Sequence, residues 1–197
     1  MKIAIDAMGG DHGPAVTLAG LSSSISIHPD LEAMVFGSED KVVPFLKKYA
    51  LLKNDRIDFV HTTEIVKMDD KPAVALRSKK DSSMRRAIDA VKNGSCGACV
   101  SAGNTGALMG IARFVLKTMP GISRPAICGT MPGIKKSTKL LDLGANVDCS
   151  SEDLLGFGIM GSVLARYTSE IENPTVALLN IGMEEIKGNE QIRKASE

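Results

Sequence analysis

The sequence predicts an α/β fold in which a mostly parallel sheet carries helices on both faces, giving three layers. Short apolar runs alternate with segments of helical periodicity along almost all of the 197 residues. Several of these runs end in loops that combine glycine with Asp, Asn, His or Lys, as is typical at the carboxyl ends of parallel strands. A hydrophobic content of 44% is enough for a substantial core. We therefore expect a single α/β domain over residues 1–197.

The first hundred residues contain four predicted strands, at positions 2–7, 32–37, 56–60 and 96–100. The segments between them predict helices over residues 14–27, 39–50, 72–78 and 81–93. Pro14 suits the first turn of its helix, where the N–H that proline lacks would have no partner. Ser38 can cap the second helix, which Pro44 either bends or causes to start late. Gly94 is a suitable C-terminal cap for the fourth.

The stretch Ser101-Ala102-Gly103-Asn104-Thr105-Gly106-Ala107 connects a predicted buried strand to a buried helix over residues 108–116. Its glycines allow backbone N–H groups to converge on one point, and the helix dipole adds partial positive charge there. Asn104 and Thr105 can either cap the helix or contact a ligand. The sequence therefore indicates an anion site, and the alternative is a tight turn that needs glycine only for its geometry.

The remainder of the chain continues the alternation of strands and helices. Strands are predicted at residues 125–129 and 139–143, and the short connection between them, with Pro132 and Gly133, favours an antiparallel hairpin. A helix capped by Ser150 or Ser151 follows, to about residue 169. A strand over 175–180 and a helix from about Asn189 come last. Because that helix reaches the end of the sequence without a cap or a closing strand, we expect a fragment.

Four loops follow predicted strands and have a similar composition: residues 6–13, 101–106, 142–146 and 180–188. Four such loops at one sheet edge predict a shared site. Within them, His12 is a candidate acid, base or phosphate donor that Asp11 or Asp6 would orient; the alternative is a loop histidine that bonds to backbone. Lys187 is either a contact for an anion or a solvated side chain.

Other patterns exclude several classes of function. The net charge of +1 gives no support to nucleic-acid binding. Cys96 and Cys99 form a CxxC pair, but it lies inside a predicted strand without further metal ligands at suitable spacing, so buried thiols in a reducing cytoplasm are expected. The GxGxxG pattern at 156–161 falls inside a predicted helix, so it is not a dinucleotide site. No signal peptide or membrane-spanning run is visible.

A local group of cations, Lys79, Lys80, Arg85 and Arg86, is left outside these motifs. It is either a solvated face or a contact surface for an acidic partner.

In this order, the four loops resemble those of the PlsX family, the bacterial phosphate acyltransferases of fatty acid and phospholipid synthesis. The similar segments are residues 3–11, 101–107, 141–146, 179–182 and 187–189. Family members continue beyond the point at which this sequence ends. The resemblance implies a fold like that of isocitrate and isopropylmalate dehydrogenases, and transfer of a long-chain acyl group from acyl carrier protein to inorganic phosphate. It also implies a homodimer, a cytoplasmic location with loose membrane association, and delivery of product to a membrane glycerol-3-phosphate acyltransferase.

Such a reaction needs no covalent enzyme nucleophile, because phosphate is itself nucleophilic and a thiolate is an adequate leaving group. We expect neither a cofactor nor a metal. Asp6 and Asp142 are expected to fix loops rather than react. The candidate catalytic residues are His12, Asn104 and Lys187. The candidate substrate-binding residues are Asp6, Gly9, Gly10, Asp11, Gly103, Thr105, Gly106, Asp142, Gly144, Asn146 and Gly182.

Two alternatives remain open. One is an enzyme related to phosphotransacetylases or decarboxylating dehydrogenases, although the latter need a cluster of metal-binding Asp residues that is not evident. The other is an inactive fragment that binds a carrier protein.

Overall fold

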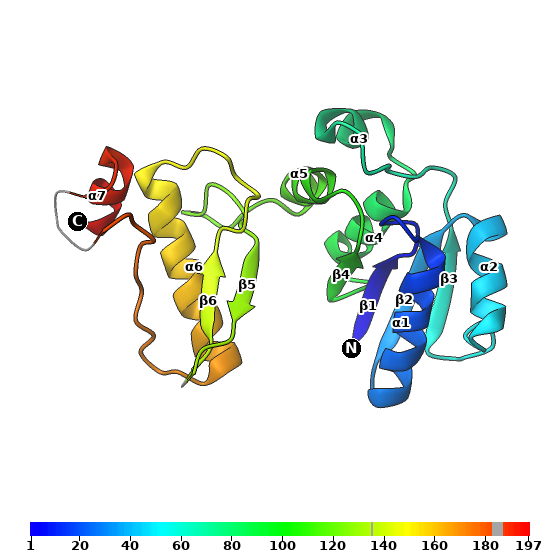
Figure 1. Ribbon diagram of the computed structural model, residues 1–197. Helices are drawn as coiled ribbons and strands as arrows, with labels where there is room; N and C mark the ends of the chain where they lie inside the picture. The colour runs from blue at the N-terminus through cyan, green and yellow to red at the C-terminus, as the bar shows by residue number, and fades with distance from the viewer. Residues whose placement is uncertain (135, 183–186) are drawn as a thin grey trace. The chain divides into compact units, whose positions relative to one another are not determined.

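The computed structural model describes residues 1–134, 136–182 and 187–197. It divides into two compact units, Met1–Lys117 and Thr118–Glu197, and each has a sheet of its own (Figure 1). The expectation of a single domain over residues 1–197 stays a prediction.

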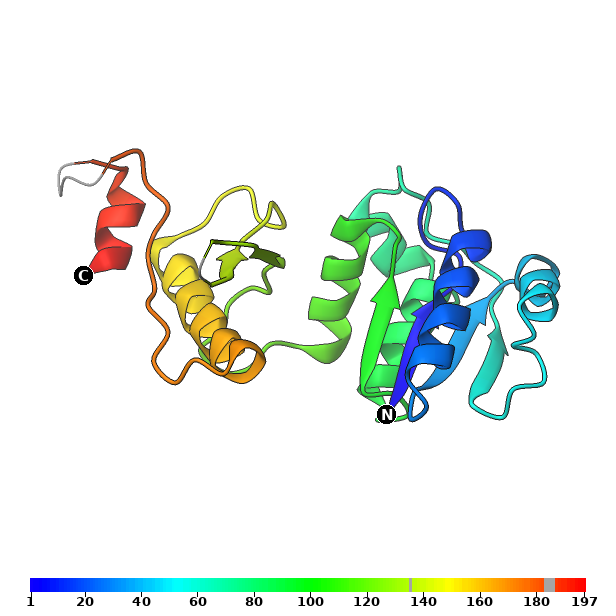
Figure 2. The ribbon, with the colours of Figure 1, turned by 60° about the horizontal axis from the view of Figure 1, so that its bottom comes forward.

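The first unit is built on a parallel sheet of four strands. These are β1 (Lys2–Asp6), β2 (Glu32–Gly37), β3 (Ile57–His61) and β4 (Ala98–Ser101), in the order β3-β2-β1-β4. The register pairs Asp6 with Phe36 on one side and with Ser101 on the other, so β1, β2 and β4 end at the same edge of the sheet. The prediction of parallel strands separated by helices is confirmed in this unit, as can be followed in Figure 2.

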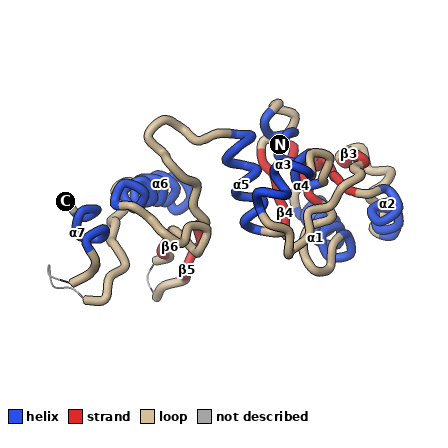
Figure 3. Tube along the Cα trace, turned by 90° about the horizontal axis from the view of Figure 1, so that it is seen from above, coloured by secondary structure: helices blue, strands red, loops and turns tan. Residues whose placement is uncertain are grey.

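Helices cover both faces of this sheet, and the alternation of side chains along each strand decides which face a residue joins. Ile5 and Val35 pack with α1 (Pro14–Ile27) and α2 (Glu39–Lys48) on one face. Their neighbours Ala4 and Phe36 pack with α4 (Ser83–Lys92) on the other. Helices α3 (Pro72–Ser78) and α5 (Thr105–Leu116) extend that layer by packing with α4. Figure 3 shows these helices around the strands.

Local sequence signals account for most helix ends. Pro14 begins α1, and Gly94, with φ +80°, follows the C-terminus of α4. Helix α2 begins at Glu39 and contains Pro44, so the proline does not delay its start. The Ser38 hydroxyl, expected to cap α2, donates to the Asp40 carboxylate and accepts no helix N–H.

The second unit contains an antiparallel pair, β5 (Cys128–Met131) and β6 (Thr138–Leu141), which confirms the predicted hairpin. Helix α6 (Ser151–Ser169) follows, with a reciprocal capping box between Ser150 and Asp153, and α7 (Glu190–Ser196) lies near the end of the chain. The GxGxxG pattern lies within α6, as expected.

The predicted strand at 175–180 is wrong, because this segment is irregular. Val176 and Leu179 in it are 60% and 87% exposed. A strand requires a neighbour for its N–H and C=O groups, and the described part of the chain supplies none at this segment. An apolar run is therefore not sufficient evidence for a strand here.

Candidate functional site

Two glycine-rich loops meet at the carboxyl edge of the parallel sheet. The loop after β1 brings Gly9 so close to the loop after β4 that a Cβ atom on Gly9 would lie 2.7 Å from the nitrogen of Gly103. Gly10, with φ +84°, lies against Ala102, whose carbonyl oxygen would be 3.0 Å from an added Cβ. Because both contacts are with backbone, side chains at Gly9 and Gly10 would push the loops apart. The structure thus joins two of the four predicted loops.

Asp6 holds this junction together. The carboxylate is buried at 2% exposure, and its Oδ2 accepts a hydrogen bond of 2.6 Å from the Ser101 hydroxyl. The Ser101 oxygen in turn accepts from the Gly103 N–H at 3.1 Å, while Asp6 Oδ1 accepts from the Met8 N–H at 3.2 Å. The carboxylate therefore connects the ends of two adjacent strands to the loops that follow them, in agreement with the predicted loop-fixing role.

Ser101 was not among the candidate site residues, although the sequence contains a signal for it. Asp6 and Ser101 are paired at the ends of two neighbouring parallel strands. A polar residue that ends a buried strand beside another such strand is a natural partner for its carboxylate.

Asn104 is the N-cap of α5, and its side chain is fully engaged. Its Oδ1 accepts from the Ala107 N–H at 2.9 Å. Its amide nitrogen donates to the carbonyl oxygens of Met68 and Asp70, at 2.8 and 2.9 Å, with a longer contact to that of Lys67. The side chain, which is 8% exposed, therefore attaches the loop before α3 to the start of α5.

The first N–H groups of α5 remain accessible at this point. Thr105 and Gly106 are exposed, and no residue in the described part of the chain accepts a hydrogen bond from either backbone N–H. They point outward from a helix N-terminus, where the dipole is positive. Thr105 and Gly106 thus form the part of the predicted site that can contact an anion through backbone, whereas the buried Gly103 N–H is committed to Ser101.

His12 and Asp11 lie in the same β1 loop and are both exposed. In the ranges that the structure describes, neither Asp6 nor Asp11 forms a hydrogen bond with His12, so the expected orientation of the imidazole by a carboxylate is not seen. Its proposed chemical role stays a prediction.

A second ordered loop lies in the second unit, around Asp142. Its Oδ1 accepts from the N–H groups of Ile127 and Ala145 at 2.9 and 3.2 Å. Its Oδ2 accepts from the backbone and side-chain nitrogens of Asn146 at 2.7 and 3.0 Å. Gly144, with φ +86°, allows the chain to turn between them. Asp142, Gly144 and Asn146 therefore form one ordered loop, in agreement with the expected loop-fixing role of Asp142. Their binding of substrate stays a prediction.

The acid sensitivity of this loop follows from these donors. Partial burial alone would raise the pKa of Asp142, but the N–H donors of Ile127, Asn146 and Ala145 and the Asn146 amide hold it below its usual value. Because the folded pKa is below the unfolded value of about 3.9, the ionised carboxylate stabilises the unit above that pH. We expect this contribution to decline as the pH falls below about 4 and to be lost once the pH is below the folded pKa. Acid unfolding of wild type and Asp142→Asn, followed by circular dichroism, should therefore converge at low pH; curves that remain parallel would contradict it.

The last predicted loop includes Gly182 and Lys187, while residues 183–186 lie outside the described residues. Asn180 connects its two ends: its Nδ2 donates to the Lys187 carbonyl at 3.2 Å, and its Oδ1 accepts from the Ile181 N–H at 2.8 Å. The Lys187 side chain is exposed. Since β6 belongs to an antiparallel pair and residues 175–180 form no strand, the four loops do not all follow strands of one sheet, which corrects that expectation.

The two cysteines of the CxxC pair are free thiols, and their surroundings do not favour the reactive thiolate form. Burial raises the pKa of Cys99 to about 12, and the nearby Asp6 carboxylate acts in the same direction. Burial also raises the pKa of Cys96. The prediction of structural thiols is thus supported, and neither is suited to act as a nucleophile.

We expect iodoacetamide at pH 8 to leave Cys96 and Cys99 unlabelled over a period in which Cys128 reacts. The measurement is mass spectrometry of the native chain, with the urea-unfolded chain as the control in which all four cysteines react. Labelling of Cys99 as fast as Cys128 would show that its thiolate is accessible.

Neither a metal centre nor a membrane span emerges from the described ranges. They contain no group of three or more His, Cys, Asp or Glu side chains placed to hold a metal ion. None of the helices in them combines the length and the apolar character required to cross a bilayer.

Comparison with known proteins agrees with this fold. The chain is similar in structure to the EutD phosphotransacetylase from Staphylococcus aureus, with a TM-score of 0.64 at 17% identity, over 99% of this chain and 62% of that one. It thus has the α/β fold of that class of protein.

The sequence relatives define the family. Residues 1–197 match the family described as fatty acid synthesis protein. The chain is 55% identical to the phosphate acyltransferase of Methylococcus capsulatus and 51% identical to that of a Janthinobacterium species, over 99% and 100% of its length. It spans 58% and 55% of those two proteins. The chain belongs to this family, the PlsX phosphate acyltransferases, which confirms the resemblance of its loops.

Proposed function

We propose that the protein transfers a long-chain acyl group from acyl carrier protein to inorganic phosphate. A phosphate oxygen attacks the thioester carbonyl carbon, the C–S bond breaks, and the carrier leaves as a thiolate that takes up a proton. The observation that supports this most is the junction of the Gly9 and Gly103 loops beside the accessible N–H groups at the start of α5. Such donors can hold phosphate or stabilise the oxyanion of the tetrahedral intermediate.

The remaining site residues take roles that fit their surroundings. Asn104 and Asp6 position the loops, since their polar atoms are committed to protein partners. Exposed His12 would give the proton to the leaving thiolate, and exposed Lys187 would attract anionic substrate. The raised thiol pKa of Cys99 favours direct attack by phosphate over an acyl-cysteine intermediate.

The rest of the proposal follows the family resemblance. The protein would be a homodimer, and each copy would have one three-layer domain, a sheet between two layers of helices, connected as in isocitrate and isopropylmalate dehydrogenases. It would be cytoplasmic and would associate loosely with the membrane. Its acyl phosphate would pass to a membrane glycerol-3-phosphate acyltransferase.

The test of this proposal is phosphate-dependent release of thiol from a long-chain acyl carrier protein, together with binding of inorganic phosphate measured by calorimetry. Thr105→Pro removes one of the accessible N–H groups at a helix position that tolerates proline. We expect it to weaken phosphate binding about tenfold, the effect of losing one charge-assisted hydrogen bond.

Thr105→Ala is the matched control, because it keeps the N–H and removes only the hydroxyl and methyl groups of the side chain. Equal phosphate affinity in wild type and Thr105→Pro would exclude the Thr105 N–H from the site. Thiol release that is independent of phosphate, or that occurs only with an acetyl thioester, would contradict the proposed reaction.

A further inference from the structure

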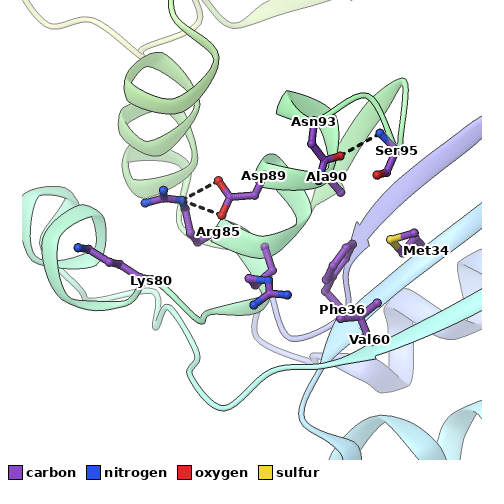
Figure 4. Close-up of a pocket in the computed structure, with 10 residues that line it drawn as sticks. Met34, Phe36, Val60, Lys80, Arg85, Asp89, Ala90, Asn93 and Ser95 are labelled. Atoms are coloured by element: carbon purple, nitrogen blue, oxygen red, sulfur yellow. Dashed lines mark hydrogen bonds and ion pairs between the residues drawn. The ribbon is translucent and has the colours of Figure 1, made fainter.

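A groove lies beside α4, on the sheet face opposite to α1 and α2. It has a volume of about 410 Å³. Met34 and Phe36 of β2 and Val60 of β3 form an apolar floor, and Arg85, Asp89 and further residues of α4 form one wall (Figure 4). Phe36 itself is only 3% exposed, so the floor is recessed and does not protrude.

Positive charge is concentrated at this part of the chain. Residues 77–92 contain six Lys or Arg and two Asp side chains, a net charge of +4, whereas the whole chain carries +1. Three of those cations, Lys80, Arg85 and Arg86, line the groove, and Asp89 is the one acidic residue among the lining side chains. Three of the four cations grouped in the sequence therefore line a concave surface, whereas the fourth, Lys79, pairs with Asp70 outside it.

Two of the cations are held in place by neighbouring carboxylates. Arg85 Nε donates to both oxygens of Asp89 at 3.0 and 3.1 Å, and Arg86 donates to Asp81 at 3.0 Å. Lys80 is exposed, and the described residues provide no hydrogen bond or ion pair for it. The groove thus combines two oriented guanidinium groups with an available ammonium group.

The cationic end of the groove adjoins the glycine loops. Met84, which precedes Arg85, packs against Gly103 so closely that a Cβ on Gly103 would lie 2.9 Å from its Cε. Since α4 connects two parallel strands, its N-terminal turn lies at the carboxyl edge of the sheet, where those loops meet.

We propose that this groove docks an acidic amphipathic helix of the protein that delivers the acyl thioester. The inference rests on the proposed function and locates the partner's contact surface. Apolar residues of such a helix would cover Met34, Phe36 and Val60, and its carboxylates would face Lys80 and Arg86. A recessed floor suits a helix better than an anionic membrane, which apolar side chains must enter by protruding.

The test measures binding of fluorescently labelled acyl carrier protein to the chain by anisotropy. We expect the double variant Lys80→Glu/Arg86→Gln to raise Kd about tenfold and to reduce its dependence on salt. Lys53→Glu is the control, because Lys53 is also an exposed loop lysine but is not part of the groove. We expect that change to alter Kd less than twofold. Circular dichroism establishes that each variant is folded.

Three results would overturn the docking proposal: no binding of carrier protein by the wild type, an equal loss in Lys53→Glu, or an unchanged Kd in the double variant. If the chain bound vesicles of anionic phospholipid through these groove residues and did not bind carrier protein, the groove would be a membrane-contact surface.

A second assay separates this proposal from the proposed function. Phosphate-dependent thiol release from a long-chain acyl thioester of a small thiol should be unchanged in Lys80→Glu, since no carrier protein needs to dock. If that release persists while the Kd for carrier protein is unchanged in the groove variants, the docking proposal is wrong and the proposed reaction stands. If carrier affinity falls in the variants and neither substrate shows phosphate-dependent release, docking stands and the reaction fails.

Discussion

Replacing Asn104 by alanine is expected to lower the free energy of unfolding by about 2 kcal/mol, the combined effect of a lost helix cap and of lost hydrogen bonds to partly exposed carbonyl groups. The Ala107 N–H would lose its acceptor, and the carbonyls of Met68 and Asp70 would lose their donor. Urea unfolding followed by circular dichroism gives the total, and amide hydrogen exchange of residues 105–116 shows whether α5 loosens at its start.

Two further variants separate the contribution of the helix cap to stability from that of the tether, the hydrogen bonds from the Asn104 amide to the carbonyls of residues 67–70. Asn104→Asp keeps an oxygen for the cap but turns a second oxygen toward the carbonyls, so we expect it to be about as destabilising as alanine. Asn189 caps α7 at an exposed position, where its Oδ1 accepts from Ile192 at 2.9 Å. Asn189→Ala therefore removes a cap and one exposed hydrogen bond to the Gln191 side chain, and we expect a loss of about 1 kcal/mol or less.

These outcomes decide how Asn104 contributes to function. A stable Asn104→Asp protein would mean that the tether to residues 67–70 is unimportant, and would leave the amide available for a ligand. Loss of stability in both variants would make Asn104 a positioning residue, so that an inactive Asn104→Ala protein would carry no information on chemistry.

The sequence was sufficient for the elements that local signals specify. Pro14 marks the start of α1, and Gly94 follows the end of α4, because each residue has a backbone preference that few others share. Strands β1 and β2 were predicted within one residue of their observed bounds, since their apolar runs are buried on both faces.

Long-range contacts were beyond such reasoning. The carbonyls that hold Asn104 come from residues more than thirty positions away, in a loop whose side chains give no hint of the contact. The apolar run at 175–180 was assigned to a strand on composition, which says nothing of whether a neighbouring strand is present. The fold class was thus predictable, while the hydrogen bonds that order the site required the structure.

Substitution of Gly9 by alanine should damage the site more directly than any side-chain deletion. The added methyl group would lie 2.7 Å from the Gly103 nitrogen, 3.0 Å from its Cα and 2.9 Å from Asp6 Oδ2. None of these atoms belongs to a flexible side-chain end, so the two loops must separate. We expect a loss of about 2–3 kcal/mol in unfolding free energy, as for overpacking in a core, and phosphate binding too weak to detect by calorimetry.

Gly20→Ala is the matched control, because Gly20 lies within α1 and no atom would be within 4 Å of the new methyl group. We expect it to raise stability by up to about 1 kcal/mol, through the higher helix propensity of alanine, and to leave phosphate binding unchanged. If Gly9→Ala instead bound phosphate as the wild type does, the contact between the Gly9 and Gly103 loops would not form the anion site. The accessible N–H groups of α5 would then bind phosphate independently of that contact.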